Sequence, residues 1–413
     1  MDSKNICDIF NSEHLMSRVK KNNLIWLTVF SWLLVLWANT SNSTEKYSNN
    51  IKPLFMALDN SLPNYVGYDC WHGYEDILDN LRDAQNGVPP EKDKVKIAEC
   101  LMNSAKTEYP PLIFATSVFS DESINAVTRG IEIVSSRLGN YGPYHVYLVG
   151  NNEEKGFVVD VEEIAKIYCN SADKYTEEPF ENCFENAMND FPNFGCCGAA
   201  HNPSHGIGQN IRYQSAVFSE DNRSTKEGRS IITSAHEYIH VYQNGFFLWG
   251  NDIAAEQAGL TEEYSHGPVW LEEGFAEGLA QKFTYQDGYN NHYKDFLNEA
   301  LDAAIKVNRI HKFTLRDIAT RQDQANVRSI CEECQGWLQY ETAAIALAVL
   351  ESQIGNENFI DSFKSYYGNV PIVGWESAFE VSFGMSMNEF YEMIDIFMEK
   401  PKKEQRKIIH KLL

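Results

Sequence analysis

The sequence predicts an α+β fold in which a small mixed sheet precedes a mostly helical C-terminal half. Short apolar runs typical of strands are confined to the chain up to residue 218, and after Gln243 the pattern is helical. The chain has 413 residues, 43% of them hydrophobic and 13% aromatic, which is typical of a folded protein with a full core. We therefore expect one large domain or two smaller ones.

An uncharged apolar stretch, Leu24–Ala38, dominates the N-terminal region of residues 1–40, and Arg18, Lys20 and Lys21 precede it. At about 15 residues it is short for a transmembrane helix, which needs roughly 20, and fits the core of a signal peptide. Its three tryptophans could instead sit at a membrane interface. We expect residues 1–40 to be either a cleaved signal peptide or an N-terminal membrane anchor.

Residues 41–108 are predicted to form a polar spacer followed by a small helical region. Helical patterns occur near residues 74–84 and 94–105. Cys70 and Cys100 are natural partners for a disulfide that joins the two helices.

The main domain is expected to span residues 109–400 and begins with strand and helix patterns in alternation. Residues 112–119 and 144–149 have the pattern of strands and flank an amphipathic helical pattern at 122–138. Residues 211–218 are a plausible edge strand. These runs provide the strands of the predicted sheet.

Residues 151–205 hold four cysteines and many polar residues, which predicts an insertion held by disulfides. Only Cys7 precedes the apolar leader, so eight cysteines remain, an even number typical of disulfides in an exported chain. Cys331 and Cys334 have redox-motif spacing, but no thioredoxin-like βαβ pattern surrounds them, and the second spaced pair of a zinc ribbon is missing. We expect a structural disulfide there. Residues 401–413 are predicted to be a basic C-terminal tail.

The formal net charge of −23 excludes some classes of partner. Nucleic acids and anionic membrane surfaces carry phosphates that this charge would repel. No basic patch with interleaved aromatic residues occurs. We expect no nucleic-acid partner, and membrane contact only through Leu24–Ala38 if that segment is retained.

The stretch from His236 to His240, His-Glu-Tyr-Ile-His, has the spacing of a zinc-binding helix. Histidines four residues apart share one face of a helix, so both imidazoles can reach one ion. Glu237 can then act as general base on a water in the open position of the ion. No proline or glycine occurs between Ser230 and Gln243. An apolar stripe at helical spacing supports the helix and consists of Ile232, Ala235, Ile239 and Tyr242.

A catalytic zinc site needs a third protein ligand. The metzincin motif would place a histidine six positions after His240, where Phe246 stands, and its glycine is replaced by Gln243. That class is excluded. The helical pattern Trp270–Glu277 instead carries Glu273 and Glu277 one turn apart, so it could present a ligand together with a residue that supports a ligand.

The order of these motifs resembles that of the gluzincin zinc peptidases. Trp-Leu-x-Glu-Gly-Phe-Ala after His-Glu-x-x-His is similar to aminopeptidase N-like enzymes, and Trp-x-Glu-Glu-Gly-x-Ala-Glu is similar to bacterial collagenase-type catalytic domains. The resemblance implies a thermolysin-like fold, Zn²⁺ as cofactor, His236, His240 and Glu273 as ligands, and Glu237 as general base. The loop between the two motifs is longer than in the aminopeptidase pattern, which the slow growth of loop-closure entropy allows.

A second match begins at Tyr340 and resembles the Tyr-Glu-x-Gly-x-x-x-Leu helix of aminopeptidase-like members. In that family the tyrosine steadies the oxyanion of the tetrahedral intermediate, so the resemblance implies a catalytic role for Tyr340. Thr342 and Ala343 replace the usual Lys-Gly, and an ordinary tyrosine at the start of a helix is the alternative interpretation. The resemblance covers roughly residues 112–398.

One motif departs from the aminopeptidase pattern. The segment from Gly206 to Asn210 is faintly similar to the strand whose glutamate pairs with the free amine of the substrate. Gln209 would stand in its place, and a neutral amide cannot form that ion pair. This alignment favours internal cleavage over aminopeptidase action; the alternative is an ordinary glycine turn.

These observations predict a secreted or extracytoplasmic zinc peptidase that hydrolyses a peptide or protein substrate, with a zinc-activated water and Glu237 as base. Internal cleavage, as by an endopeptidase, is the expected mode of action. The alternative is a non-catalytic extracellular binding protein that keeps the zinc fold. The intact Glu237 argues against this alternative, because a site without catalytic activity does not need a general base. Motifs for other hydrolase, nucleotide or dinucleotide chemistry are absent from the sequence.

Overall fold

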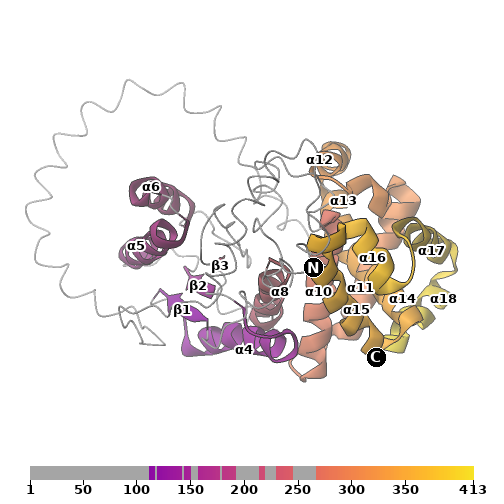
Figure 1. Cartoon of the computed structure of the whole chain (residues 1–413), viewed down its shortest axis with the longest axis horizontal. Coiled ribbons are helices and arrows are strands. Elements are labelled where there is room, and N and C mark those ends of the chain that lie inside the picture. Colours follow the sequence, from indigo (N-terminus) through magenta and orange to yellow (C-terminus); the bar gives the residue numbers. More distant parts are fainter. Residues whose placement is uncertain are drawn as a thin grey trace, which may run out of the picture.

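The chain forms a small sheet flanked by helices, followed by a C-terminal half made of helices (Figure 1). This arrangement confirms the predicted α+β class with a helical C-terminal half. The computed structural model describes residues 111–116, 119–141, 144–149, 157–176, 179–191, 214–218, 229–244 and 267–413.

The described strands form one three-stranded sheet in the order β1 (Leu112–Ala115), β2 (Tyr144–Leu148) and β3 (Gln214–Phe218). Both pairs are parallel. The prediction of a mixed sheet is therefore wrong for these strands, whereas the edge position of β3 is confirmed. Helical segments connect successive strands and return the chain to the end of the sheet where the previous strand began, so each new strand runs parallel to the last.

Helices cover both faces of this sheet. Along β2, Val146 and Leu148 belong to the large core that includes helices α4 (Asp121–Leu138) and α8 (Arg229–Asn244), whereas Tyr147 belongs to a separate cluster. Alternate side chains of a strand point to opposite faces. A parallel sheet covered on both faces needs apolar residues at successive positions, and all five residues of β2 are buried.

The separate cluster lies between the sheet and helices α5 (Phe157–Thr176) and α6 (Phe180–Asp190). A disulfide between Cys169 and Cys183 joins the two helices. Residues 157–190 of the expected insertion therefore provide the crossover from β2 to β3, and this part of the segment is a structural layer of the sheet.

Helix α4 determines where α8 lies. Its first turn is capped by Ser120, whose side chain accepts a hydrogen bond from the Ser123 backbone at 3.1 Å. At Gly130 the helices touch so closely that an added Cβ would lie 2.0 Å from Ser234 Oγ and 2.2 Å from the carbonyl oxygen of Ile231. Glycine is required at this contact because any side chain would push the helices apart.

Helix α10 (Val269–Gln286) packs against both α8 and α14 (Ala343–Ile354) and lies at the side of the helical half that faces α8 (Figure 1). Around them lie α11 (Tyr293–Lys306), the π-helix η8 (Val307–His311), the 3₁₀ helix η9 (Leu315–Ile318), α12 (Arg321–Ile330), α13 (Glu332–Trp337), the π-helix η10 (Leu338–Thr342), α15 (Asn356–Val373), α16 (Trp375–Phe383), α17 (Met387–Glu399), α18 (Lys402–Ile409) and the 3₁₀ helix η11 (His410–Leu412).

Two features fix α10 against α14. An added Cβ at Gly274 would lie 2.7 Å from Ala343 Cβ, so the backbones approach closely. Further along α10, the buried Lys282 forms an ion pair with Glu351 of α14 and donates to Asn356 Oδ1 at 2.5 Å. A buried charge of this kind is tolerated because it is paired and hydrogen-bonded. The helix that carries Glu273 is therefore held rigidly.

The C-terminal residues also pack onto the domain. In α18, Ile409 and Gln405 are buried, and Gln405 Nε2 donates to the carbonyl oxygen of Phe397 at 3.0 Å. Among the helices that the structure describes, none is long and apolar enough to cross a membrane.

Several predictions concern segments outside the described residues. They are the leader at residues 1–40, the region 41–108 with the pair Cys70 and Cys100, and the segment that contains Gln209.

Candidate metal centre

His236 and His240 on α8 and Glu273 on α10 form a buried group whose ligand atoms all lie within 4.8 Å of one another. The two histidines are four residues apart on a helix, so their imidazoles leave the same face. The rings meet edge to face, with centroids 4.8 Å apart, and each residue is only 9% exposed. Helix α10 packs across this face and brings in the carboxylate.

The distances between the donor atoms fit a single cation. His236 Nε2 lies 3.1 Å from His240 Nε2, and both nitrogens lie 3.3 Å from Glu273 Oε2. Donors about 2.1 Å from a tetrahedral zinc ion are roughly 3.4 Å apart, so these three atoms correspond to one face of such a tetrahedron. Two imidazoles and a carboxylate are also ligands that zinc accepts. The group could therefore hold a metal ion.

Glu277, one turn after Glu273, holds the first histidine. Its Oε2 lies 3.2 Å from His236 Nδ1, and its Oε1 accepts a hydrogen bond from Gln281 Nε2 at 2.9 Å. An ionised carboxylate only accepts, so Nδ1 carries the proton and Nε2 keeps its lone pair for a metal. This contact agrees with the prediction that Glu277 supports a ligand residue and is not itself one of the three donors.

Gln243 accepts a hydrogen bond from the second histidine, His240. This role of Gln243 was not predicted from the sequence. His240 Nδ1 lies 2.6 Å from Gln243 Oε1, and Gln243 Nε2 donates to the carbonyl oxygen of Glu272 at 3.0 Å and to Tyr367 Oη at 2.7 Å. A carbonyl oxygen accepts only, so the amide nitrogen must face Glu272 and the amide oxygen must face His240. His240 therefore donates through Nδ1 and presents Nε2 as a ligand.

Glu273 is held from its other side by a chain of amides. Gln339 Nε2 donates to Glu273 Oε1 at 3.2 Å and lies 3.2 Å from Tyr340 Oη. Gln335 Nε2 in turn donates to Gln339 Oε1 at 2.5 Å. Gln339 and Tyr340 belong to the π-helix η10, a kind of local insertion that is frequent at functional sites. The ring centroids of Tyr340 and His236 are 6.2 Å apart, so the tyrosine lies beside the group.

Burial and mutual charge set the protonation of these residues. Burial raises the pKa of Glu237. The two histidines lower the pKa of this carboxyl group, and the nearby Glu273 and Glu277 raise it again. Burial would raise the pKa of Glu273 as well, but His240 and His236 hold it well below its usual range. Burial, and then the carboxylates Glu273 and Glu237, raise the pKa of the Tyr340 phenol, so it stays protonated as a donor. The carboxylates give the site a negative charge that favours a cation.

The structure thus brings together His236, His240, Glu273 and Tyr340, four of the five residues singled out as ligands or catalytic groups. Glu237 lies on the same helix and interacts electrostatically with both histidines. Oε1 of Glu272 lies 3.7 Å from His240 Nδ1, the ring nitrogen that does not face Glu273. A sequence signal for Gln243 is its position three residues after His240, which puts both on one helix face. Gln339 has no such signal.

Comparisons with protein-family models, with curated proteins and with solved structures found no match to this chain. The geometry itself shows a buried histidine–histidine–glutamate group that could bind a metal ion. The disulfides Cys169–Cys183 and Cys331–Cys334 point to an oxidising compartment, and the second of them confirms the disulfide expected there.

Proposed function

We propose that this chain is an extracytoplasmic zinc peptidase that cleaves internal bonds of peptides or proteins. The observation that carries the proposal is the buried group of His236, His240 and Glu273, with Glu237 directly after the first histidine on the same helix. The order of the motifs, which resembles that of gluzincin peptidases, supports a peptide bond as the substrate. Two disulfides support a location outside the cytoplasm.

In this proposal His236, His240 and Glu273 hold the cation, which when bound supplies a Lewis acid for water activation and carbonyl polarisation. Glu237 takes a proton from the attacking water and delivers it to the leaving amine, and the pKa that burial raises makes its carboxylate a stronger base. Tyr340 Oη remains protonated and donates to the developing oxyanion.

The alternative function is a non-catalytic extracellular binding protein that retains the zinc fold. The arrangement around Glu237 favours catalysis, because a carboxylate whose pKa burial raises costs stability and has no use in a purely structural site.

The test incubates the purified, zinc-loaded chain with a mixed peptide library and maps new termini by mass spectrometry. We expect internal cuts from the native chain and a loss of at least 100-fold in rate for Glu237→Gln, which keeps the side-chain shape. Trimming of single residues from N-termini would make it an aminopeptidase. Absence of cuts from a zinc-bound native chain would support the binding protein.

A second measurement assigns the third ligand. Zinc content after dialysis should fall sharply in Glu273→Ala, and the neighbouring Glu272→Ala is the matched control that keeps its zinc. If Glu273→Ala retains zinc, the third ligand is Glu272 or Glu277 and the proposed centre is wrong.

A further inference from the structure

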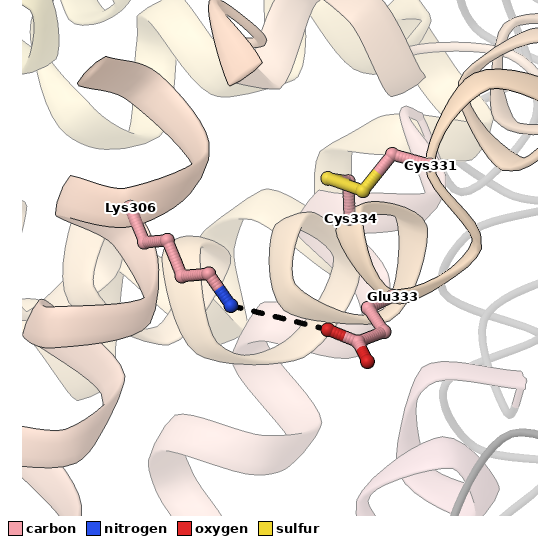
Figure 2. Close-up of a disulfide and its surroundings, with 4 residues drawn as sticks. All are labelled: Lys306, Cys331, Glu333 and Cys334. Atoms are coloured by element: carbon pink, nitrogen blue, oxygen red, sulfur yellow. Dashed lines mark ion pairs between the residues drawn. A yellow bond between two sulfur atoms is a disulfide. The ribbon is translucent and has the colours of Figure 1, made fainter. Parts of the chain in front are cut away.

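A second group of metal-binding side chains lies away from the central one. His311, Cys331 and Cys334 place their ligand atoms within 4.8 Å of one another. The two cysteines form a disulfide at the start of α13, and Figure 2 shows it above the turn that carries Glu333. Cys334 is fully buried, and His311 ends the π-helix η8 that follows α11.

The Cys331–Cys334 disulfide contributes little to holding the fold together. It closes a loop between residues three apart, whereas Cys169–Cys183 spans fourteen and joins two helices. Closing a longer loop restricts the unfolded chain more. The short turn is also held by its own backbone, because Cys334 N donates to the Cys331 carbonyl oxygen at 3.1 Å. Opening the disulfide would therefore leave both sulfur atoms close together.

His311 is held in place by the surrounding backbone. Arg309, two residues earlier, donates to the carbonyl oxygens of Met398 and Lys400 at 3.0 and 3.1 Å. Directly after His311, Lys312 adopts the left-handed conformation with φ of 64°, which is uncommon for a residue other than glycine. A π-helix that ends in such a residue is an unusual local structure, and it brings an imidazole beside two sulfur atoms.

The donor set and local charge suit a thiophilic cation. Two thiolates and an imidazole are typical zinc ligands, and around a tetrahedral zinc ion they are roughly 3.4–3.8 Å apart, so rotation of the side chains from the present group suffices. The exposed Glu332 and Glu333 lie between the cysteines and add negative charge. Lys306 Nζ lies 3.9 Å from Glu333 Oε2, and this ion pair occupies the positive charge of the lysine (Figure 2). The same Nζ lies 3.9 Å from the centroid of the Trp337 ring.

We propose that His311, Cys331 and Cys334 form a second, redox-controlled site that binds Zn²⁺ when the disulfide is reduced. A small dithiol supplies two electrons: the protein S–S bond breaks, the protein gains two thiols, and the reductant closes to its cyclic disulfide. Zinc binding then releases the two thiol protons to solvent. In the reverse exchange the cyclic disulfide takes two electrons from the two thiolates and two protons from solvent and becomes the dithiol again. The protein S–S bond re-forms and the ion is released, so the two states exclude each other.

The test replaces zinc with Co²⁺, because thiolate-to-cobalt charge transfer absorbs in the near ultraviolet. The full chain is reduced with a water-soluble phosphine and titrated with Co²⁺, beside the double variant Cys331→Ser/Cys334→Ser. After reduction, the native chain should bind one more equivalent than the double variant and show additional sulfur absorption; before reduction the two should be equal. Comparison with this variant removes the contribution of the other cysteines.

A variant that leaves the cysteines intact tests the histidine. His311→Ala should weaken this additional cobalt binding at least 10-fold, whereas the exposed His292→Ala is the matched control and should not. Equal cobalt binding and absorption in the native chain and the double cysteine variant would overturn the proposal, and so would full affinity in His311→Ala. The central group contains no sulfur, so Glu273→Ala should keep the signal whatever the outcome for the proposed peptidase.

Discussion

Each histidine of the central group is oriented by an acceptor on its Nδ1 atom. Glu277 contacts His236 Nδ1 at 3.2 Å, and Gln243 contacts His240 Nδ1 at 2.6 Å. Both contacts select the tautomer that presents Nε2 toward Glu273. The affinity of the site for a metal should therefore depend on residues that do not touch the ion.

Removing either acceptor should weaken zinc binding. We expect Gln243→Leu and Glu277→Leu to lower zinc affinity by about 10- to 100-fold, because the imidazoles lose their fixed orientation. Competition titration against a fluorescent chelator measures the affinity. Glu277→Gln keeps an acceptor oxygen and should recover part of the loss, and the surface Gln322→Leu should leave the affinity unchanged. Native affinity in Gln243→Leu would contradict the role given to this amide.

Tyr340 should matter for catalysis and not for metal binding. Its hydroxyl is held near Gln339 Nε2, and its raised pKa keeps it protonated. If it donates to the oxyanion, Tyr340→Phe should lower kcat by about 100- to 1000-fold with little change in KM, the typical cost of losing one such donor. Steady-state kinetics on a peptide cleaved by the native chain, together with zinc content, separates the two effects. A kcat close to native would leave Tyr340 as an ordinary residue of its helix.

At the scale of secondary-structure elements, close helix contacts place the donor groups. Helix α4 meets α8 at Gly130, and α10 meets α14 at Gly274, directly after Glu273. At both glycines, atoms of the facing helix occupy the space that a side chain at that position would need. A shift of α8 or α10 by an ångström would separate the two imidazoles from the carboxylate.

Two glycine substitutions should therefore have opposite effects. Alanine normally stabilises a helix interior relative to glycine by about 0.5–1 kcal/mol. At Gly278 the nearest atoms to an added Cβ are 4.0 Å away, so Gly278→Ala should show this gain. At Gly130 the new Cβ meets α8 backbone, so Gly130→Ala should destabilise the fold by about 1–3 kcal/mol and weaken zinc binding. Urea unfolding of both variants checks the signs; a stabilised Gly130→Ala would disprove the tight contact.

At the scale of the whole molecule, stability should depend on pH through a buried carboxyl group. Burial raises the pKa of Glu341 from 4.5 to about 7, and its Oε2 has no hydrogen-bond partner among the described residues. A raised pKa means that the folded chain binds the proton more tightly than the unfolded chain. The stabilisation from this group is therefore fully present below pH 4.5 and is lost as the pH rises through about 7.

Glu341→Gln should consequently be more stable than the native chain at pH 8, by up to about 3 kcal/mol, and should lose most of this advantage at pH 5. Denaturant midpoints at the two pH values measure the difference. Glu389→Gln is the opposite case: hydrogen bonds from Ser386 lower the pKa of Glu389, so this substitution should destabilise the chain at pH 8. A gain for Glu341→Gln that is equal at both pH values would exclude titration as its cause.

Local sequence patterns predicted the individual elements well. The pattern at 122–138 corresponds to α4 at Asp121–Leu138, and the pattern around the two histidines corresponds to α8 at Arg229–Asn244. Hydrophobic periodicity and the absence of helix breakers are properties of neighbouring residues, so the sequence displays them directly. The parallel direction of the sheet was missed because it depends on how the connecting segments cross, which periodicity does not report.

By itself the sequence determined that His236 and His240 share one helix face, because their spacing matches one helical turn. The motif resemblance added Glu273 as a third ligand. Only the tertiary structure decided that Glu273 comes within 3.3 Å of both imidazoles, and that Gln243 and Gln339 hold the group from outside. Those contacts join residues on α8, α10 and η10. Their distances follow from the packing of helices at Gly130 and Gly274, and a local sequence pattern does not specify how helices distant in the chain pack.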